Sequence, residues 1–521
     1  MVDEMGADQS RDGGPDNDGG DGAWGKTKAN IMKQSDKYLM GKVGHEGPRQ
    51  GEPLRNCCYC PDVIFFFLWL TCFLCIFSIG THYGIGQTAA VMDDDYGHES
   101  SGSRYIFSLI ALALFWSMLI AAVWAMWTAR SGSQVMQTAF TLGCAALCIV
   151  GFLEDVSSYQ WYFGIGLFLI AVCGALSYRV IRDVAPHRLV TLKVGCQFVK
   201  SSPALETLMC FHLIVAALLC LWFAFCIVGL LYHFQGNGVR TDYQQLDNKN
   251  TAYIMVILMF LYCAQVLRNI MICTTAGTLA EWWYQYTSLD GDHHAAKHPA
   301  HSAACDTYRR SWTYSLPPIC YGSFVIAPFE TIYSFASLFK GPCQMICPPV
   351  ADLLDKCGEL YHGYAYVFIG THGYSLMTAG RKTFSLFVNE GVAVMENDCV
   401  IETLCLWADI TIACITSVMA IMMVDHGPEY WTRGVDCPRT LCGLIGLFCG
   451  WCISGVATGV VVGANKAVLT LFLENPHVLE DTHPNEHKEL TQAYRLVDKK
   501  EVPTTAHMAV AEPDDGAYGL A

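Results

Sequence analysis

Apolar stretches of membrane-spanning length recur from about Val63 to Gly463, with polar and often charged segments between most of them. The hydrocarbon core of a bilayer is roughly 30 Å thick, so a helix that rises about 1.5 Å per residue needs about 20 apolar residues to cross it. The pattern therefore predicts an all-α, polytopic membrane protein with about ten transmembrane helices. The expected spans are Val63–Thr81, Tyr105–Trp127, Val135–Leu153, Tyr159–Tyr178, Thr207–Tyr232, Ala252–Thr275, Trp312–Leu338, Tyr361–Ala379, Val400–Val424 and Leu441–Gly463.

Basic residues alternate between the loops that separate these spans. Lys and Arg in short loops stay preferentially on the cytoplasmic side of a membrane. They precede the first span and follow the fourth and sixth spans, whereas the first span is followed by three aspartates, Asp93 to Asp95. The alternation predicts that both tails are cytoplasmic. The basic residues are Lys26, Lys42, Arg49 and Arg55, then Arg179, Arg182, Arg188, Lys193 and Lys200, then Lys297, Arg309 and Arg310.

Composition favours one large membrane domain over several soluble domains, because 53% of the residues are hydrophobic and only 15% are charged. The net charge of -15 lies largely in the tails. We expect residues 1–55 to form a disordered acidic tail, residues 56–466 to form the transmembrane domain, and residues 467–521 to form a second cytoplasmic tail. The lipid bilayer is the expected partner, and no nucleic-acid partner is expected.

Several chemistries receive little support from the sequence. Many of the 26 cysteines lie inside apolar stretches, where cysteine serves as a small packing residue. The loop after span six contains histidines, but no carboxylate or cysteine spacing completes a metal shell around them. No phosphate-binding glycine loop or Ser/His/Asp arrangement is found, so no enzymatic activity, metal or cofactor is expected. The histidines are His293, His294, His298 and His301; Cys57, Cys58 and Cys60, before the first span, could be palmitoylated or inert.

Polar side chains inside the expected spans are candidates for a functional cavity, because an ionisable group in hydrocarbon costs on the order of 2.5–3.5 kcal/mol on insertion scales. On span six, Gln265, Arg268 and Asn269 are expected to share one helical stripe that faces protein or water. Span seven is interrupted by prolines and carries Glu330, which is typical of transporters but also of a packing kink. Span nine carries Asp409 at depth.

The segment from Asn269 to Tyr284, Asn-Ile-Met-Ile-Cys-Thr-Thr-Ala-Gly-Thr-Leu-Ala-Glu-Trp-Trp-Tyr, resembles a hallmark stretch of the choline transporter-like family. Further similar stretches are Arg55–Phe67, Tyr321–Ser323, Ala365–Phe387 and Leu469–Tyr494. Only a short segment separates Thr81 from Tyr105, so the chain resembles the compact members that lack a large first extracellular loop.

This resemblance implies a ten-helix transporter for choline or a related small organic cation, in the plasma membrane or an organelle membrane, without a cofactor. A quaternary ammonium has no N–H to donate, so it is held by aromatic faces, each contributing about 0.5–2 kcal/mol, and by diffuse negative charge. An interfacial aromatic belt is the alternative role of Trp282 and Trp283. The candidate residues are the rings Trp282, Trp283, Tyr284, Tyr321 and Tyr374, the carboxylates Glu281, Glu330 and Asp409, and the amide Asn269.

The expected mechanism is alternating access around one midplane cavity bounded by spans six, seven and nine. The membrane potential is a sufficient driving force, since a cation gains about 2.3 kcal/mol per 100 mV. Proton-linked antiport through one of the three carboxylates stays open. The competing class is a non-transporting scaffold or a channel-like protein, although no filter-forming segment supports a channel.

Overall fold

Helices are the only regular elements in the part of the chain that the structure describes. A computed structural model covers the protein, and the described residues are 62–85, 101–131, 190–236, 243–284, 300–325, 363–390, 393–427 and 438–501. The expected all-α class is confirmed within these ranges. The acidic amino-terminal tail, the cysteines before the first span and the spans expected at Val135–Leu153 and Tyr159–Tyr178 lie outside them.

Six helices in the described ranges are long and apolar enough to cross a membrane. Each coincides with an expected span, so helices of membrane-spanning length are confirmed at these six positions, while the total of ten and the orientation of the tails stay predictions. The helices are α2 (Asp62–Ile79) with its π-helical continuation η2 (Gly80–Ile85), α4 (Ser101–Ser131), α8 (Pro203–Gly236), α9 (Tyr243–Tyr284), α16 (Ala393–His426) and α17 (Pro438–Glu474).

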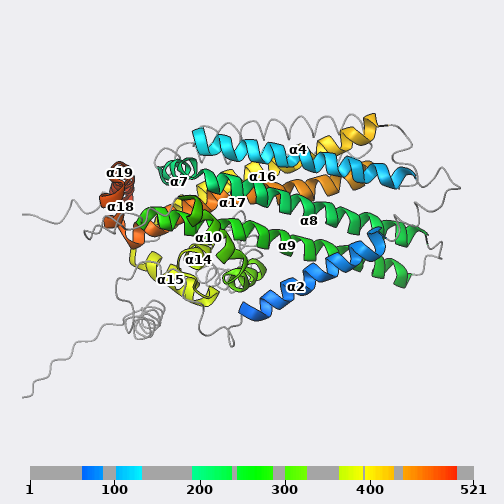
Figure 1. Ribbon diagram of the computed structural model, residues 1–521, viewed down its shortest axis with the longest axis horizontal. Coiled ribbons are helices and arrows are strands. Elements are labelled where there is room, and N and C mark those ends of the chain that lie inside the picture. The colour runs from blue at the N-terminus through cyan, green and yellow to red at the C-terminus, as the bar shows by residue number, and fades with distance from the viewer. Residues whose placement is uncertain are drawn as a thin grey trace, which may run out of the picture. The chain divides into compact units, whose positions relative to one another are not determined.

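Helix α17 is the central helix of this bundle, with its main contacts to α16, α9 and α4 (Figure 1). In the most apolar 18-residue segment of α17, 83% of the residues are buried, whereas 11% are buried in the corresponding segment of α2. Small residues explain the difference, because glycines at 459 and 463 let α9 approach the α17 backbone closely. The large exposed side chains of α2, such as Ile64 and Phe67, are those expected of a lipid-facing helix.

Four shorter helices were not expected from hydropathy, because they are short and carry charged residues. They are α7 (Val190–Ser201), α10 (Ala300–Trp312), α18 (Pro476–Thr482) and α19 (Pro484–Glu501). α7 packs on α17 and α4, and α10 packs on α9 and α8. The expected domain boundary at residue 466 falls inside α17, and α18 and α19 then contact α9 and α7.

The seventh expected span begins later than predicted. Its helix runs from Leu316 to Val325 in the described residues. Pro317 and Pro318 lie in the first turn, where the missing N–H groups would have no hydrogen-bond partner within the helix. The segment that begins at Trp312 is instead the end of α10, followed by a turn. Glu330 lies outside the described residues.

The eighth expected span, Tyr361–Ala379, is not one continuous helix. It is divided into α14 (Ala365–His372) and α15 (Leu376–Glu390), both too short for a core of roughly 30 Å. Gly373 adopts φ 68°, which L side chains rarely adopt, and its N–H donates to the Ile369 carbonyl at 3.0 Å to close α14. The Leu376 N–H, at the start of α15, donates to Asp62 Oδ2 of α2 at 3.4 Å.

Backbone proximity between α9 and α14 leads to a stability prediction. A Cβ on Gly370 would lie 3.0 Å from the Cα of Cys273, and one on Gly277 would lie 2.7 Å from the Gly370 carbonyl oxygen. Gly370→Ala must therefore separate the two helices, and we expect it to lower the free energy of unfolding by roughly 1–3 kcal/mol. The measurement is the melting temperature in detergent.

The matched control is Gly455→Ala on α17. Its Cβ would meet Arg268 Cδ at 3.7 Å, an ordinary van der Waals contact, so little change is expected. Equal melting temperatures for Gly370→Ala and Gly455→Ala would contradict the close crossing of α9 and α14.

Candidate functional site

Asn269 of α9 joins three helices through one buried amide. Its Nδ2 donates to Ser323 Oγ and to the Tyr366 hydroxyl, both at 2.9 Å. Ser323 lies on the Leu316–Val325 helix and Tyr366 on α14. The two bonds use both amide protons. Through the bond to Tyr366, Asn269 holds the α14 segment against α9.

Asp409 lies in a second cluster, on α16 and against α17. The side chain is 1% exposed, and Thr458 Oγ1 donates to its two carboxylate oxygens at 3.0 and 3.1 Å. The stem of Arg268 lies over Gly455 and Gly459 of α17, and its guanidinium interacts electrostatically with Asp409.

Arg268 and Asn269 were expected to share one stripe, and the structure corrects this. Consecutive helical residues are rotated by about 100°, so Arg268 faces α17 whereas Asn269 faces Ser323 and Tyr366. The structure therefore distributes the candidate residues over separate clusters and does not bring Asn269, Asp409 and Glu281 together around one cavity.

The C-terminal end of α9 carries four of the candidate residues. Glu281 forms an ion pair with Arg310 of α10 at 3.2 Å. Trp283 is fully buried, and Trp282 packs between Phe198 of α7 and His483, with ring centroids 5.7 and 3.8 Å away. These contacts fix the end of α9 between α7, α10 and the C-terminal helices. Tyr321, by contrast, stacks on Phe65 of α2 at 4.2 Å, away from this end.

Tyr284 lies near a carboxylate that the sequence did not single out, Glu474, and Tyr374 is connected to the same carboxylate through His372. Tyr374 stacks on His372 with ring centroids 5.1 Å apart, and His372 Nε2 lies 3.9 Å from Glu474 Oε1. Tyr284 interacts electrostatically with Glu474, and its hydroxyl accepts from Asn475 Nδ2 at 2.9 Å. We call Glu474, His372, Tyr374 and Tyr284 the Glu474 cluster.

The Glu474 cluster has negative potential that its own hydrogen bonds leave uncompensated. Glu474 Oε2 is buried and has no hydrogen-bond partner in the described ranges. Thr371 has one hydroxyl proton, which it donates to the Val367 carbonyl, so it accepts from Nδ1–H of His372 at 2.7 Å. In neutral His372 the lone pair of Nε2 then faces Glu474, so both groups present negative potential to a cation that lies beside them.

Hydropathy could not reveal this arrangement. Glu474 lies beyond the expected end of the last span at Gly463, and His372 lies at a helix break that only the structure defines. The Lys382 ammonium on α15 acts electrostatically on both groups, so the cluster has an internal cation with which an external one would compete. Glu402, a further carboxylate of span nine, pairs instead with the buried Lys466.

His483, at the junction of α18 and α19, leads to a pH prediction. Burial against Trp282 holds the pKa of His483 below its ordinary value of about 6.5, and the Glu486 carboxylate opposes this shift. The undocked histidine then binds protons more readily than the docked one. Docking of α18 and α19 should be constant above pH about 6.5 and should weaken as the pH falls below it.

Hydrogen exchange of α18 and α19, corrected for the intrinsic effect of pH, measures this docking. His483→Phe retains the ring but not the titration, and should remove the pH dependence between pH about 7.5 and 5.5. A dependence of equal size in His483→Phe would assign the effect to another group.

Membrane-length helices with buried charged groups between them define a polytopic, multi-pass membrane protein. Residues 165–477 match the family model described as plasma-membrane choline transporter, and the chain belongs to this family. The resemblance inferred from the segment Asn269–Tyr284 is thereby confirmed, and the family is one of membrane transporters.

Several fungal proteins share the similarity over most of their length. Protein PNS1 of Kluyveromyces lactis is 23% identical over 499 residues, which cover 90% of this chain and 88% of that protein. Protein PNS1 of Cryptococcus neoformans is 24% identical over 375 residues, covering 68% and 66% of the two chains. Protein PNS1 of Saccharomyces cerevisiae is 21% identical over 365 residues, covering 66% of each.

Proposed function

We propose that the protein carries choline or a related small organic cation across its membrane, and that the Glu474 cluster is a binding site on the pathway. The observation that carries this proposal is the buried Glu474 Oε2, which lacks a partner among the described residues and lies near the rings of His372 and Tyr284. A carboxylate with aromatic neighbours suits a quaternary ammonium, which needs diffuse negative charge and no hydrogen-bond acceptor.

The break between α14 and α15 supports alternating access as the mechanism. Discontinuous helices line substrate sites in many transporters, because their free ends can move and can interact with charge. Here Gly373 ends α14 next to His372 and Tyr374, so a rotation at this glycine would change the distance from both rings to Glu474. With both tails cytoplasmic, this end of the pathway faces the cytoplasm.

Asn269, Asp409 and Glu281 then support the pathway indirectly by holding helices together, whereas Tyr284, Tyr374 and Glu474 contact the cation. Trp282 and Trp283 position the end of α9. The membrane potential is sufficient to drive such a carrier, since a single charge gains about 2.3 kcal/mol per 100 mV. A non-transporting scaffold with the same family membership is the second candidate.

Uptake of labelled choline into vesicles that contain the purified full-length protein tests the proposal. We expect uptake above that of empty vesicles, faster with an inside-negative potential and unchanged by an imposed pH gradient. Stimulation by the pH gradient would instead support antiport with protons. Uptake equal to that of empty vesicles for choline and several other amines would favour the scaffold.

A further inference from the structure

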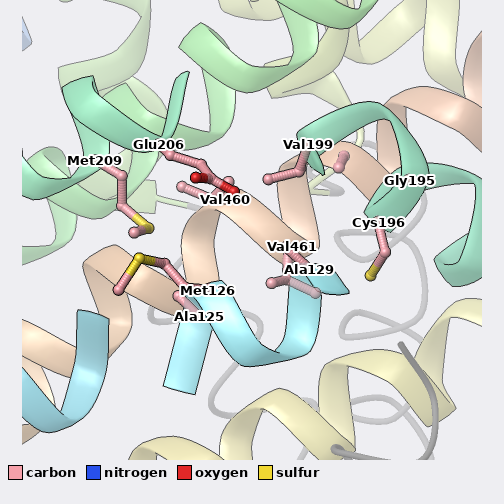
Figure 2. Close-up of a pocket in the computed structure, with 11 residues that line it drawn as sticks. Ala125, Met126, Ala129, Gly195, Cys196, Val199, Glu206, Met209, Val460 and Val461 are labelled. Carbon is pink, nitrogen blue, oxygen red and sulfur yellow. The ribbon is translucent and has the colours of Figure 1, made fainter. Parts of the chain in front are cut away.

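A small hollow lies between α4, α7, α8 and α17, apart from the Glu474 cluster. Among the residues that the structure describes, its lining is apolar except for the carboxylate of Glu206, which points inward above Val460 (Figure 2). The side chains of Met126 and Met209 face each other at one end of the hollow (Figure 2). The remaining lining residues are Ala125, Ala129, Gly195, Cys196, Val199, Val461 and Ala464.

Glu206 lacks a counter-charge among the described residues. Its side chain forms no hydrogen bond or ion pair there, although it is only partly exposed and its surroundings are apolar. Its place in the first turn of α8 is favourable for a negative charge, but this dipole effect is typically below 1 kcal/mol. A carboxylate with low-dielectric walls therefore attracts a cation more strongly than one in water.

The lining selects the kind of cation. A primary ammonium would bring three N–H donors into a hollow where Glu206 is the only charged acceptor among the described lining residues, so some donors would stay unsatisfied. A trimethylammonium group has no N–H, and its methyl groups can contact the valine, alanine and methionine side chains. The volume of about 10 Å³ holds about one water molecule, so binding requires Met126 and Met209 to move. Methionine is the side chain best suited to such movement.

On two helices, an exposed cation follows a lining residue of the hollow in the sequence. Arg130 directly follows the lining residue Ala129 on α4, and Lys200 directly follows Val199 on α7. α7 is an amphipathic helix that packs on the membrane helices α17 and α4. These positive charges suit the phosphate of a zwitterionic headgroup, while Glu206 suits its ammonium.

We propose that this hollow is a second binding site, which takes a trimethylammonium group through Glu206. The group comes either from free choline or from a phosphocholine lipid headgroup. This second site goes beyond the proposed function. Only its use by free choline rests on the proposed function; its use by a lipid headgroup does not.

The test is binding to the purified full-length protein in maltoside detergent free of phosphocholine lipid. The probes are labelled choline, dihexanoylphosphatidylcholine as the headgroup probe and ethanolamine as the primary-ammonium control. We expect Glu206→Gln to weaken binding of one trimethylammonium probe about tenfold or more, and to leave the weak binding of ethanolamine unchanged. Glu206→Asp retains the charge and should retain most of the affinity. Glu480→Gln, at an exposed position of α18, is the matched control and should bind as the wild type does.

The outcomes separate the two sites and the two sources. A loss for choline alone assigns the hollow to free substrate, and a loss for the phosphocholine probe alone assigns it to lipid; both support the site. Glu474→Gln should lower choline binding at the Glu474 cluster but leave the Glu206-dependent part of the binding in place. Glu206-dependent binding in a protein without choline uptake would refute the proposed function and retain this site. If Glu206→Gln, with a wild-type melting temperature, binds both probes as the wild type does, the site is refuted. If Glu206→Gln is unstable, equal affinity in Glu206→Asp and Glu206→Lys refutes it.

Discussion

Replacing Glu474 by Gln is expected to lower choline uptake between about 10- and 100-fold, with the protein still folded. The substitution retains the shape of the side chain but removes the charge that attracts the cation. A charge pair at about 4 Å is worth about 1 kcal/mol in water and about 4 kcal/mol near a protein surface, and the expected loss, about 1.4–2.7 kcal/mol, lies between these two values. The measurement is the initial rate of labelled choline uptake into vesicles over a range of choline concentrations.

Two further variants make this test specific. Lys382 is the internal cation that acts on Glu474, so Lys382→Met should increase the apparent affinity for choline. Glu480→Gln removes an exposed carboxylate of α18 and should leave uptake unchanged. Uptake by Glu474→Gln equal to that of Glu480→Gln would exclude the Glu474 cluster from the pathway.

The largest effect on stability is expected at Asp409 and Arg268. Asp409→Asn removes the carboxylate that acts on the Arg268 charge, and Arg268→Met leaves the buried carboxylate of Asp409 with only the neutral groups Thr458 and Ser454 acting on it among the described residues. We expect each single substitution to lower the free energy of unfolding by roughly 3 kcal/mol, the scale for an uncompensated charge within a membrane. Unfolding in mixtures of detergent and dodecyl sulfate measures this energy.

The double variant Asp409→Asn/Arg268→Met should be destabilised by less than the sum of the single effects, because neither charge is left alone. The exposed pair of Lys193 and Glu489, at 2.7 Å, is the matched control. Glu489→Gln should change stability by less than about 1 kcal/mol. Additive effects of Asp409→Asn and Arg268→Met would show that the two charges act independently.

Much of the helical architecture could be predicted from the sequence. Long apolar stretches predict spans well, because each residue in contact with lipid must itself be apolar and each backbone group must be bonded within its helix. That constraint is local, so α8, α9, α16 and α17 lie where hydropathy placed them. Hydropathy did not predict the short helices α7 and α10, because they are stabilised by contacts with α17 and α9 rather than by a long apolar run.

The candidate site was less predictable, because it is formed by contacts between residues that are distant in the sequence. Of the predicted residues, Tyr284 and Tyr374 lie in the Glu474 cluster, whereas Asn269 and Asp409 lie in separate clusters. Glu474 and His372 are far apart in the sequence, and no spacing rule connects the end of one helix with the break in another. A helical stripe drawn from sequence also could not show that adjacent residues, Arg268 and Asn269, face different helices.

The sequence by itself determined the class of the protein, most of its membrane-length helices and, through the segment Asn269–Tyr284, its family. The tertiary structure decided which polar groups meet. In lipid the apolar surfaces of all helices are nearly equivalent, so hydrophobicity drives insertion but does not select neighbours. Close packing of small residues and a few buried polar bonds select them, as the contacts of Gly370 with Cys273 and of Thr458 with Asp409 illustrate.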